Sequence, residues 1–108
     1  MKYCYPAILT LDEENILVSV PDLPGLHTYG KNPADALFMA RDAMEMWLWD
    51  AENKGESIPN ASDQAEILKM CESPCQTVSI ITADTEDFRR HINSYVTKTR
   101  EPVPAFTG

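Results

Sequence analysis

Residues 32–55 read NPADALFMARDAMEMWLWDAENKG, and this stretch decides the fold. Asn32 can cap a helix, Pro33 suits the first helical position, where its missing N–H is not needed, and Gly55 is a typical helix stop. Apolar residues recur between these signals at spacings of three and four, which is the period of one helix face. The sequence therefore predicts one long helix, ending near Lys54, whose core-facing stripe is Leu37, Ala40, Met44, Leu48 and Ala51.

The same helix carries a second set of large apolar residues on its other side. Turning by 100° per residue places Phe38, Met46 and Trp49 away from the stripe, among Asp42 and Glu45. Either the C-terminal segment folds back over this second face, or another molecule covers it. Trp, Phe and Met are favoured in protein interfaces, so we interpret these five residues, the helix patch, as a self-association or partner interface. We expect a homodimer or a higher oligomer.

Strand-like segments lie on both sides of the helix. Residues 3–11 and 16–20 flank a polar break and predict an antiparallel hairpin. The run Pro21-Asp22-Leu23-Pro24-Gly25 ends the second strand, because proline cannot donate to a ladder. Residues 26–30 and 77–83 predict a third and a fourth strand. We interpret the proline-rich run as a rigid corner in preference to a binding loop.

Two shorter helices complete the expected order. Asp63 and Glu66 resemble a capping box and predict a short helix over 64–70, while Asp84 or Thr85 can cap a helix over 86–95. We expect a domain over residues 1–96 and an extended tail over 97–108. The predicted class is α+β, in the order β-β-β-α-β-α, with the long helix packed on a small, mainly antiparallel sheet.

The charge of the chain is unevenly placed. The net charge of its 108 residues is −8, and residues 1–76 hold thirteen acids against five bases. An acidic body repels phosphate backbones, so its natural macromolecular partner is basic. The tail differs, because Arg89, Arg90, Lys98 and Arg100 cluster there, either as ordinary solvated surface or as the remnant of a nucleic-acid-binding element.

Candidate catalytic and metal-binding patterns are weak. Cys71 and Cys75 form one loose pair, whereas a structural zinc site commonly uses two close pairs. A β-β-β-α-β order also opens ribonuclease H-type nucleases, whose metal ions need a carboxylate from the first strand, yet residues 3–11 contain no acid. We therefore expect no enzymatic activity, no metal and no cofactor.

Particular motifs resemble the HicB-type antitoxin family. They are Tyr5-Pro6-Ala7-Ile8 in the first strand, Val18-Ser19-Val20 running into the proline-rich corner, Thr28-Tyr29-Gly30 with the following Pro33-Ala34-Asp35-Ala36-Leu37, and Gly55-Glu56-Ser57-Ile58-Pro59 after the helix. The similarity extends over residues 3 to about 60 and, more weakly, 77 to 90. The Pro-Asp-Leu-Pro-Gly run, at its position between the second strand and the long helix, is the most specific part of the resemblance.

The resemblance implies a partial ribonuclease H-like fold without nuclease activity. It also implies a partner, HicA, a small basic toxin that cleaves mRNA, which the antitoxin neutralises by covering its RNA-facing surface. Family members usually carry a C-terminal DNA-binding part. After the fourth strand this sequence offers one predicted helix and a tail with Pro102 and Pro104, so we do not expect DNA binding by this chain alone.

The alternative to an antitoxin is a free-standing HicB-like adaptor without a cognate toxin. An antitoxin and a free-standing adaptor would be expected in the same cellular compartment. Three cysteines, an odd number, argue against a disulfide framework, and no run of residues is apolar enough to span a membrane. We expect a cytoplasmic protein.

Overall fold

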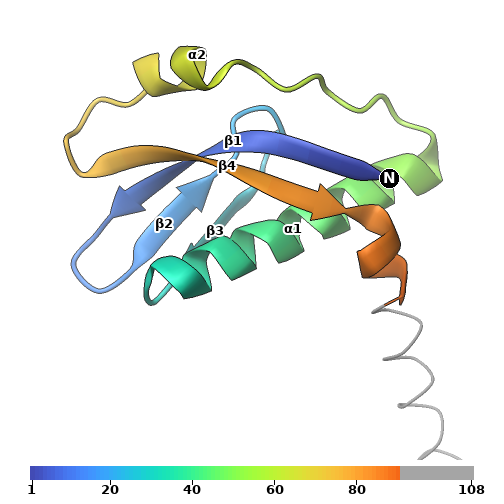
Figure 1. The fold of residues 1–108 in the computed structure, drawn as a ribbon, viewed down its shortest axis with the longest axis horizontal. Coiled ribbons are helices and arrows are strands. Elements are labelled where there is room, and N and C mark those ends of the chain that lie inside the picture. Colours follow the sequence, from blue (N-terminus) through green and yellow to red (C-terminus); the bar gives the residue numbers. More distant parts are fainter. Residues whose placement is uncertain (91–108) are drawn as a thin grey trace, which may run out of the picture.

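The computed structural model describes residues 1–90 of the chain (Figure 1). Its elements follow the predicted order: β1 (Lys2–Leu11), β2 (Ile16–Ser19), β3 (His27–Gly30), α1 (Pro33–Lys54), α2 (Gln64–Lys69) and β4 (Gln76–Asp84), after which residues 85–90 are helical. The rest of the helix predicted to Tyr95, the boundary at residue 96 and the tail 97–108 lie outside the described residues.

One four-stranded sheet forms the middle layer of the domain. The strand order is β3-β2-β1-β4, and each neighbouring pair is antiparallel. In Figure 1, α1 runs along one side of this sheet and α2 lies on the other. The predicted α+β class, with a long helix on a small antiparallel sheet, is confirmed.

The core lies between the sheet and α1. Alternate residues of β1 point to it (Tyr5, Ala7 and Leu9), and the helix contributes Ala36, Ala40, Met44, Leu48 and Ala51. Four of the five predicted stripe residues are therefore buried. Leu37 was predicted wrongly: it is 40% exposed, and Ala36 takes the buried position at the first turn. Gly30 accounts for the burial of Ala36. A Cβ at position 30 would lie 2.2 Å from the Ala36 backbone nitrogen, so the first turn of α1 packs directly against β3.

Both ends of α1 form as predicted. The Asn32 side chain accepts a hydrogen bond from the Asp35 N–H at 2.8 Å, and Gly55 adopts a left-handed conformation with φ 68°. The predicted capping box of α2 does not form, because the Asp63 side chain makes no cap hydrogen bond and only the backbone closes the first turn.

Pro6 lies within the central strand β1, where its missing N–H would normally break a ladder. The register places β1 residues 8–11 opposite β2, with Ile8 opposite Ser19. The position facing Pro6 on that side is therefore residue 21, already beyond the strand and itself a proline. The ladder loses no hydrogen bond there, because β2 has ended.

Candidate partner-binding surface

The proline-rich corner makes contacts inside the domain. Leu23 is fully buried, and Gly25 adopts φ 81°, which favours glycine. The Asp22 carboxylate accepts hydrogen bonds from the Ser62 N–H at 2.8 Å and from the Ser62 hydroxyl at 2.6 Å. The Trp47 indole N–H donates to the Pro24 carbonyl at 3.1 Å. These contacts support the interpretation of the run as a rigid corner, which joins the hairpin to α1 and to the segment after it.

The residues of the helix patch do not all lie on one exposed surface. Phe38 and Met46 are 68% and 54% exposed, and Asp42 is exposed beside them. Trp49, which we expected on an open face, is half-buried, with its ring centroid 5.4 Å from that of Phe88. The physical reason is that the helical segment 85–90 folds back over this side of α1. Within the described residues, the indole N–H of Trp49 is buried without a hydrogen-bond partner.

Glu45 was also misplaced by the sequence pattern. It is only 8% exposed, and its carboxylate accepts a hydrogen bond from the Asp84 N–H at 3.0 Å. Arg41 lies one helix turn earlier and contacts Glu45 at 3.3 Å and Asp87 at 3.2 Å. Glu45 is thus part of the packing between α1 and the end of β4 and is not free to contact a partner.

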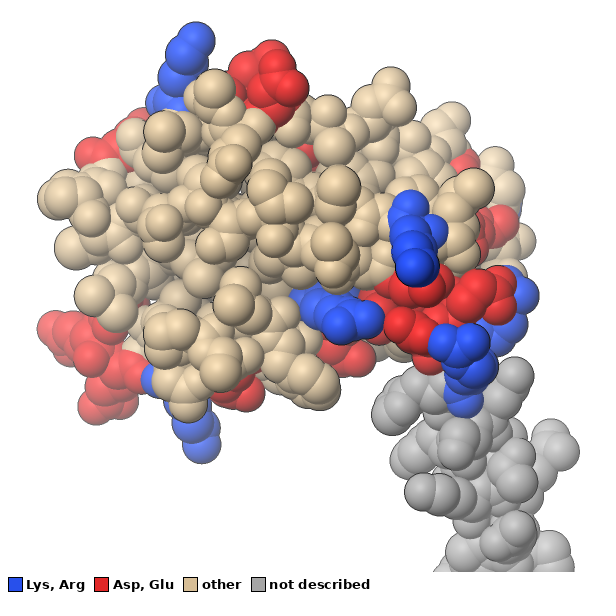
Figure 2. Space-filling model, in the orientation of Figure 1, with Lys and Arg blue, Asp and Glu red and all other residues tan. Residues whose placement is uncertain are grey.

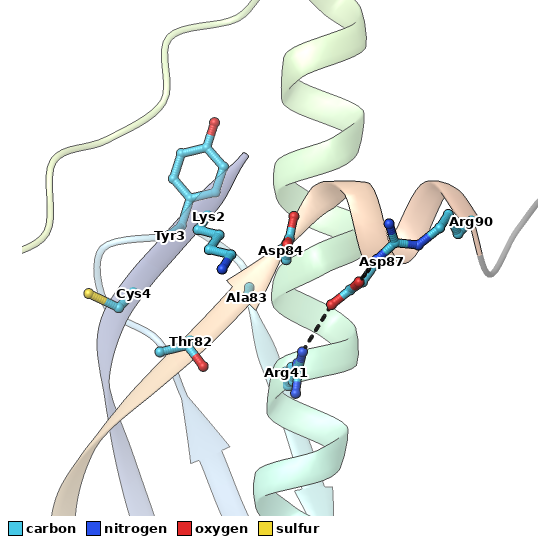
Figure 3. Close-up of a pocket in the computed structure, with 9 residues that line it drawn as sticks. All are labelled: Lys2, Tyr3, Cys4, Arg41, Thr82, Ala83, Asp84, Asp87 and Arg90. Atoms are coloured by element: carbon cyan, nitrogen blue, oxygen red, sulfur yellow. Dashed lines mark hydrogen bonds and ion pairs between the residues drawn. The ribbon is translucent and has the colours of Figure 1, made fainter.

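Figure 3 shows the hollow beside this contact, with a volume of about 640 Å³. Its labelled lining residues come from β1, α1, β4 and the helix after β4, and the dashed line joins Arg41 to Asp87. Both charge signs occur in it, and the Arg90 guanidinium pairs with Asp87. Three bases and two acids line the hollow, so their charges nearly cancel and give it little with which to select a charged ligand.

Glu52 joins the two ends of the described chain. Its carboxylate accepts hydrogen bonds from the Tyr3 hydroxyl at 2.6 Å and from the Thr85 hydroxyl at 3.2 Å. Burial, followed by the hydrogen bond and the charge of Glu52, raises the pKa of Tyr3 to about 12. The Glu86 N–H, followed by the charge of the N-terminus, lowers the pKa of Asp84.

The basic cluster predicted near the C-terminus is only partly described. Arg89 pairs with Glu86 at 3.3 Å and Arg90 pairs with Asp87, so both arginines have acidic partners on their own helix. Lys98 and Arg100 lie outside the described residues.

No metal-binding group of three His, Cys, Asp or Glu side chains forms within residues 1–90. The described cysteines, Cys4, Cys71 and Cys75, are reduced. None of the helices in this part of the chain combines the length and apolar character needed to span a membrane.

A groove between α1 and β3 brings exposed apolar and acidic side chains together. The helix contributes Met39, Asp42, Met46 and Asp50, while Gly25 and His27 come from the corner and β3. Its volume is about 610 Å³. Both carboxylates belong to exposed residues. We call it the α1–β3 groove. The helix patch spacing pointed to three of the residues that line the groove, Asp42, Met46 and Trp49, whereas no local signal pointed to His27.

Fold and surface define a class of protein: a small α+β domain whose exposed features are suited to binding. The model of the HicB-like antitoxins of bacterial toxin–antitoxin systems matches residues 5–99. The chain belongs to this family, whose members are generally binding proteins without enzymatic activity.

Relatives and solved structures agree with this assignment. The UPF0150 protein Ta0767 of Thermoplasma acidophilum is 36% identical over 63 residues, which are 57% of this chain and 88% of the relative. A toxin–antitoxin complex from Streptococcus pneumoniae contains a chain with a TM-score of 0.68 at 20% identity, covering 82% of this chain and 73% of that one. The Burkholderia pseudomallei antitoxin HicB gives a TM-score of 0.67 at 20% identity, covering 89% and 86%. A HicA3 and HicB3 toxin–antitoxin complex gives 0.60 at 20% identity, covering 76% and 99%. At these identities the structures establish a shared fold.

Proposed function

We propose that this protein is an antitoxin that binds a basic HicA-type toxin and keeps it from cleaving mRNA. The observation that carries the proposal is membership of the HicB-like family over residues 5–99. The thirteen acids against five bases in residues 1–76 supply the charge that a basic partner would recognise.

The α1–β3 groove is the surface we assign to the toxin. The stem of a lysine or arginine can lie along Met39 and Met46 while its charged head reaches the carboxylate of Asp42 or Asp50. Both thioether side chains are exposed and adaptable, which suits an interface. Negative charge would then lie where RNA phosphates approach the toxin, and the body of the domain would block access sterically.

Charge reversal at the groove tests this assignment. Asp42→Lys removes an acid and adds a base, so it should raise the Kd for the toxin by about tenfold or more. Glu66→Lys is the matched control, since it makes the same change at an exposed position of α2, on the other side of the sheet. Titration calorimetry with the purified toxin at two salt concentrations measures both. Equal weakening by the two variants would mean that only overall charge matters, and no binding by the wild type would refute the proposal itself.

A further inference from the structure

Three of the five methionines of the chain lie close together on α1, and they differ in exposure. Met44 is fully buried in the core, whereas Met39 is 36% exposed and Met46 is 54% exposed. The two exposed methionines are seven residues apart, which is about two helix turns, and both line the α1–β3 groove. Their thioether groups are therefore accessible to solvent on one face of the helix.

These two thioethers form apolar wall between the carboxylates of the groove. Asp42 lies between Met39 and Met46 in the sequence, and Asp50 follows Met46 by one helix turn. A carboxylate attracts only the charged head of a lysine or arginine, and the stem of that side chain needs apolar surface to lie on. The fit of a basic side chain in the groove therefore depends on both thioethers remaining apolar.

Charged and apolar groups are arranged differently on the face of the molecule that Figure 2 shows. This is the face in which β4 lies in front of β2 and β3 (Figure 1), and its middle is uncharged, while its acids gather toward the ends with bases among them. The groove instead places exposed carboxylates and exposed thioethers together along one helix. A change at the thioethers should therefore act directly on the contact with a basic partner.

An exposed thioether can be oxidised by a peroxide such as hydrogen peroxide. A lone pair on the sulfur attacks one peroxide oxygen, an S–O bond forms as the O–O bond breaks, and the second oxygen leaves as water. The sulfur loses two electrons and the peroxide gains them. The product is a polar, chiral sulfoxide. Covering such a group in an interface without a hydrogen-bond partner costs free energy.

We propose that Met39 and Met46 form an oxidation site whose conversion to sulfoxides weakens toxin binding at the α1–β3 groove. Because the groove is the surface assigned to the toxin, this role rests on the proposed function. Two methionines serve as internal references. Met44 lies on the same helix but is buried, and Met70 is 53% exposed at the end of α2, on the other side of the sheet (Figure 1).

Peptide mass spectrometry of the full chain after peroxide treatment tests the selectivity of the oxidation. Met39 and Met46 should each gain one oxygen atom, while Met44 stays unmodified. Bound toxin should slow the oxidation of Met39 and Met46 and leave the rate at Met70 unchanged. Oxidation of Met44 as fast as that of Met46, or toxin protection of Met70 equal to that of the groove methionines, would overturn the assignment.

Matched variants test the consequence for binding. Titration calorimetry measures the Kd of each protein for a purified basic HicA-type toxin before and after peroxide treatment. The Kd of the wild type should rise by about tenfold or more, and Met70→Leu should show the same rise. Met39→Leu/Met46→Leu should show almost no rise, whatever its starting affinity. All three proteins keep the three cysteines, so an equal rise in the double variant would assign the effect to thiol oxidation and overturn this role.

Enzymatic reduction gives a second measurement on the wild type if the double variant does not fold. Methionine sulfoxide reductases return the sulfoxide to the thioether at the expense of two thiols, which form a disulfide while the oxygen leaves as water. Toxin binding should return with these enzymes and dithiothreitol, and should not return with dithiothreitol alone. Recovery with dithiothreitol alone, or a Kd that oxidation leaves unchanged, would overturn the role of the methionines only. No binding by the untreated wild type would refute the proposed function and this role together.

Discussion

Trp47 and Trp49 lie two residues apart on α1 and belong to opposite sides of the helix. Trp47 faces the proline-rich corner, where its indole N–H donates to the Pro24 carbonyl. Trp49 faces the end of β4 and packs on Phe88, and its indole N–H is buried without a partner in the described residues. The Trp47 side of α1 is packed through apolar and backbone contacts. The other depends on carboxylates, since Glu45 and Glu52 make the contacts to β4 and to the segment after it.

The two sides of α1 should therefore respond to different perturbations. The Trp47 side should be sensitive chiefly to lost volume. The Trp49 side should be sensitive to the loss of a carboxylate, and its contribution to stability should change at alkaline pH because the pKa of Tyr3, which donates to Glu52, is raised.

Truncation on the Trp47 side should have the largest effect. Leu23 is fully buried in the corner, so Leu23→Ala should lower the free energy of unfolding by about 3 kcal/mol through lost burial and the cavity left behind. Urea denaturation measures this loss. Leu68→Ala, which shortens an exposed leucine of α2, is the control and should change stability little. A loss below about 1 kcal/mol in Leu23→Ala would mean that the corner is not rigidly packed.

Loss of a carboxylate on the Trp49 side should have an intermediate effect. Glu45→Ala removes the acceptor of the Asp84 N–H and the partner of Arg41, and should cost about 2 kcal/mol. Asp42→Ala removes an exposed carboxylate of the same helix and should cost little. Denaturation of both variants at neutral pH decides this point, and equal effects would show that the buried contact contributes nothing.

The smallest expected effect is the alkaline response of Tyr3. Its pKa is raised to about 12, so folding favours the neutral phenol. The resulting stability is fully present below the ordinary pKa of about 10 and is lost as the pH rises from about 10 to 12. The stability difference between wild type and Tyr3→Phe should therefore narrow across this window. Tyrosinate absorbance follows the ionisation of Tyr3, and denaturation at each pH measures the stability difference. A Tyr3 hydroxyl that ionises near pH 10 would contradict the described contact with Glu52.

The elements with local signals were predictable from the sequence. Asn32 and Gly55 fix the ends of α1 through contacts within a few residues, and the corner follows from two prolines that cannot donate to a ladder. The helix period also placed four of the five stripe residues correctly.

The candidate site was less predictable, because its contacts join residues far apart in sequence. Periodicity placed Glu45 and Trp49 on an open face, and only the return of residues 85–90 buries them. The spacing of Arg41 and Glu45, one helix turn apart, could have indicated their ion pair. The contact of Tyr3 with Glu52 spans 49 residues and leaves no local pattern.

Toxin inhibition is the most direct test of the account. If the proposed function holds, a purified basic HicA-type toxin should lose RNA cleavage in proportion to the amount of this protein added, reaching full inhibition near saturation. Asp42→Lys should require more protein for the same inhibition, whereas Glu66→Lys should match the wild type. Cleavage at the full rate under a saturating excess of the wild-type protein would contradict the central claim that this chain works by covering its partner.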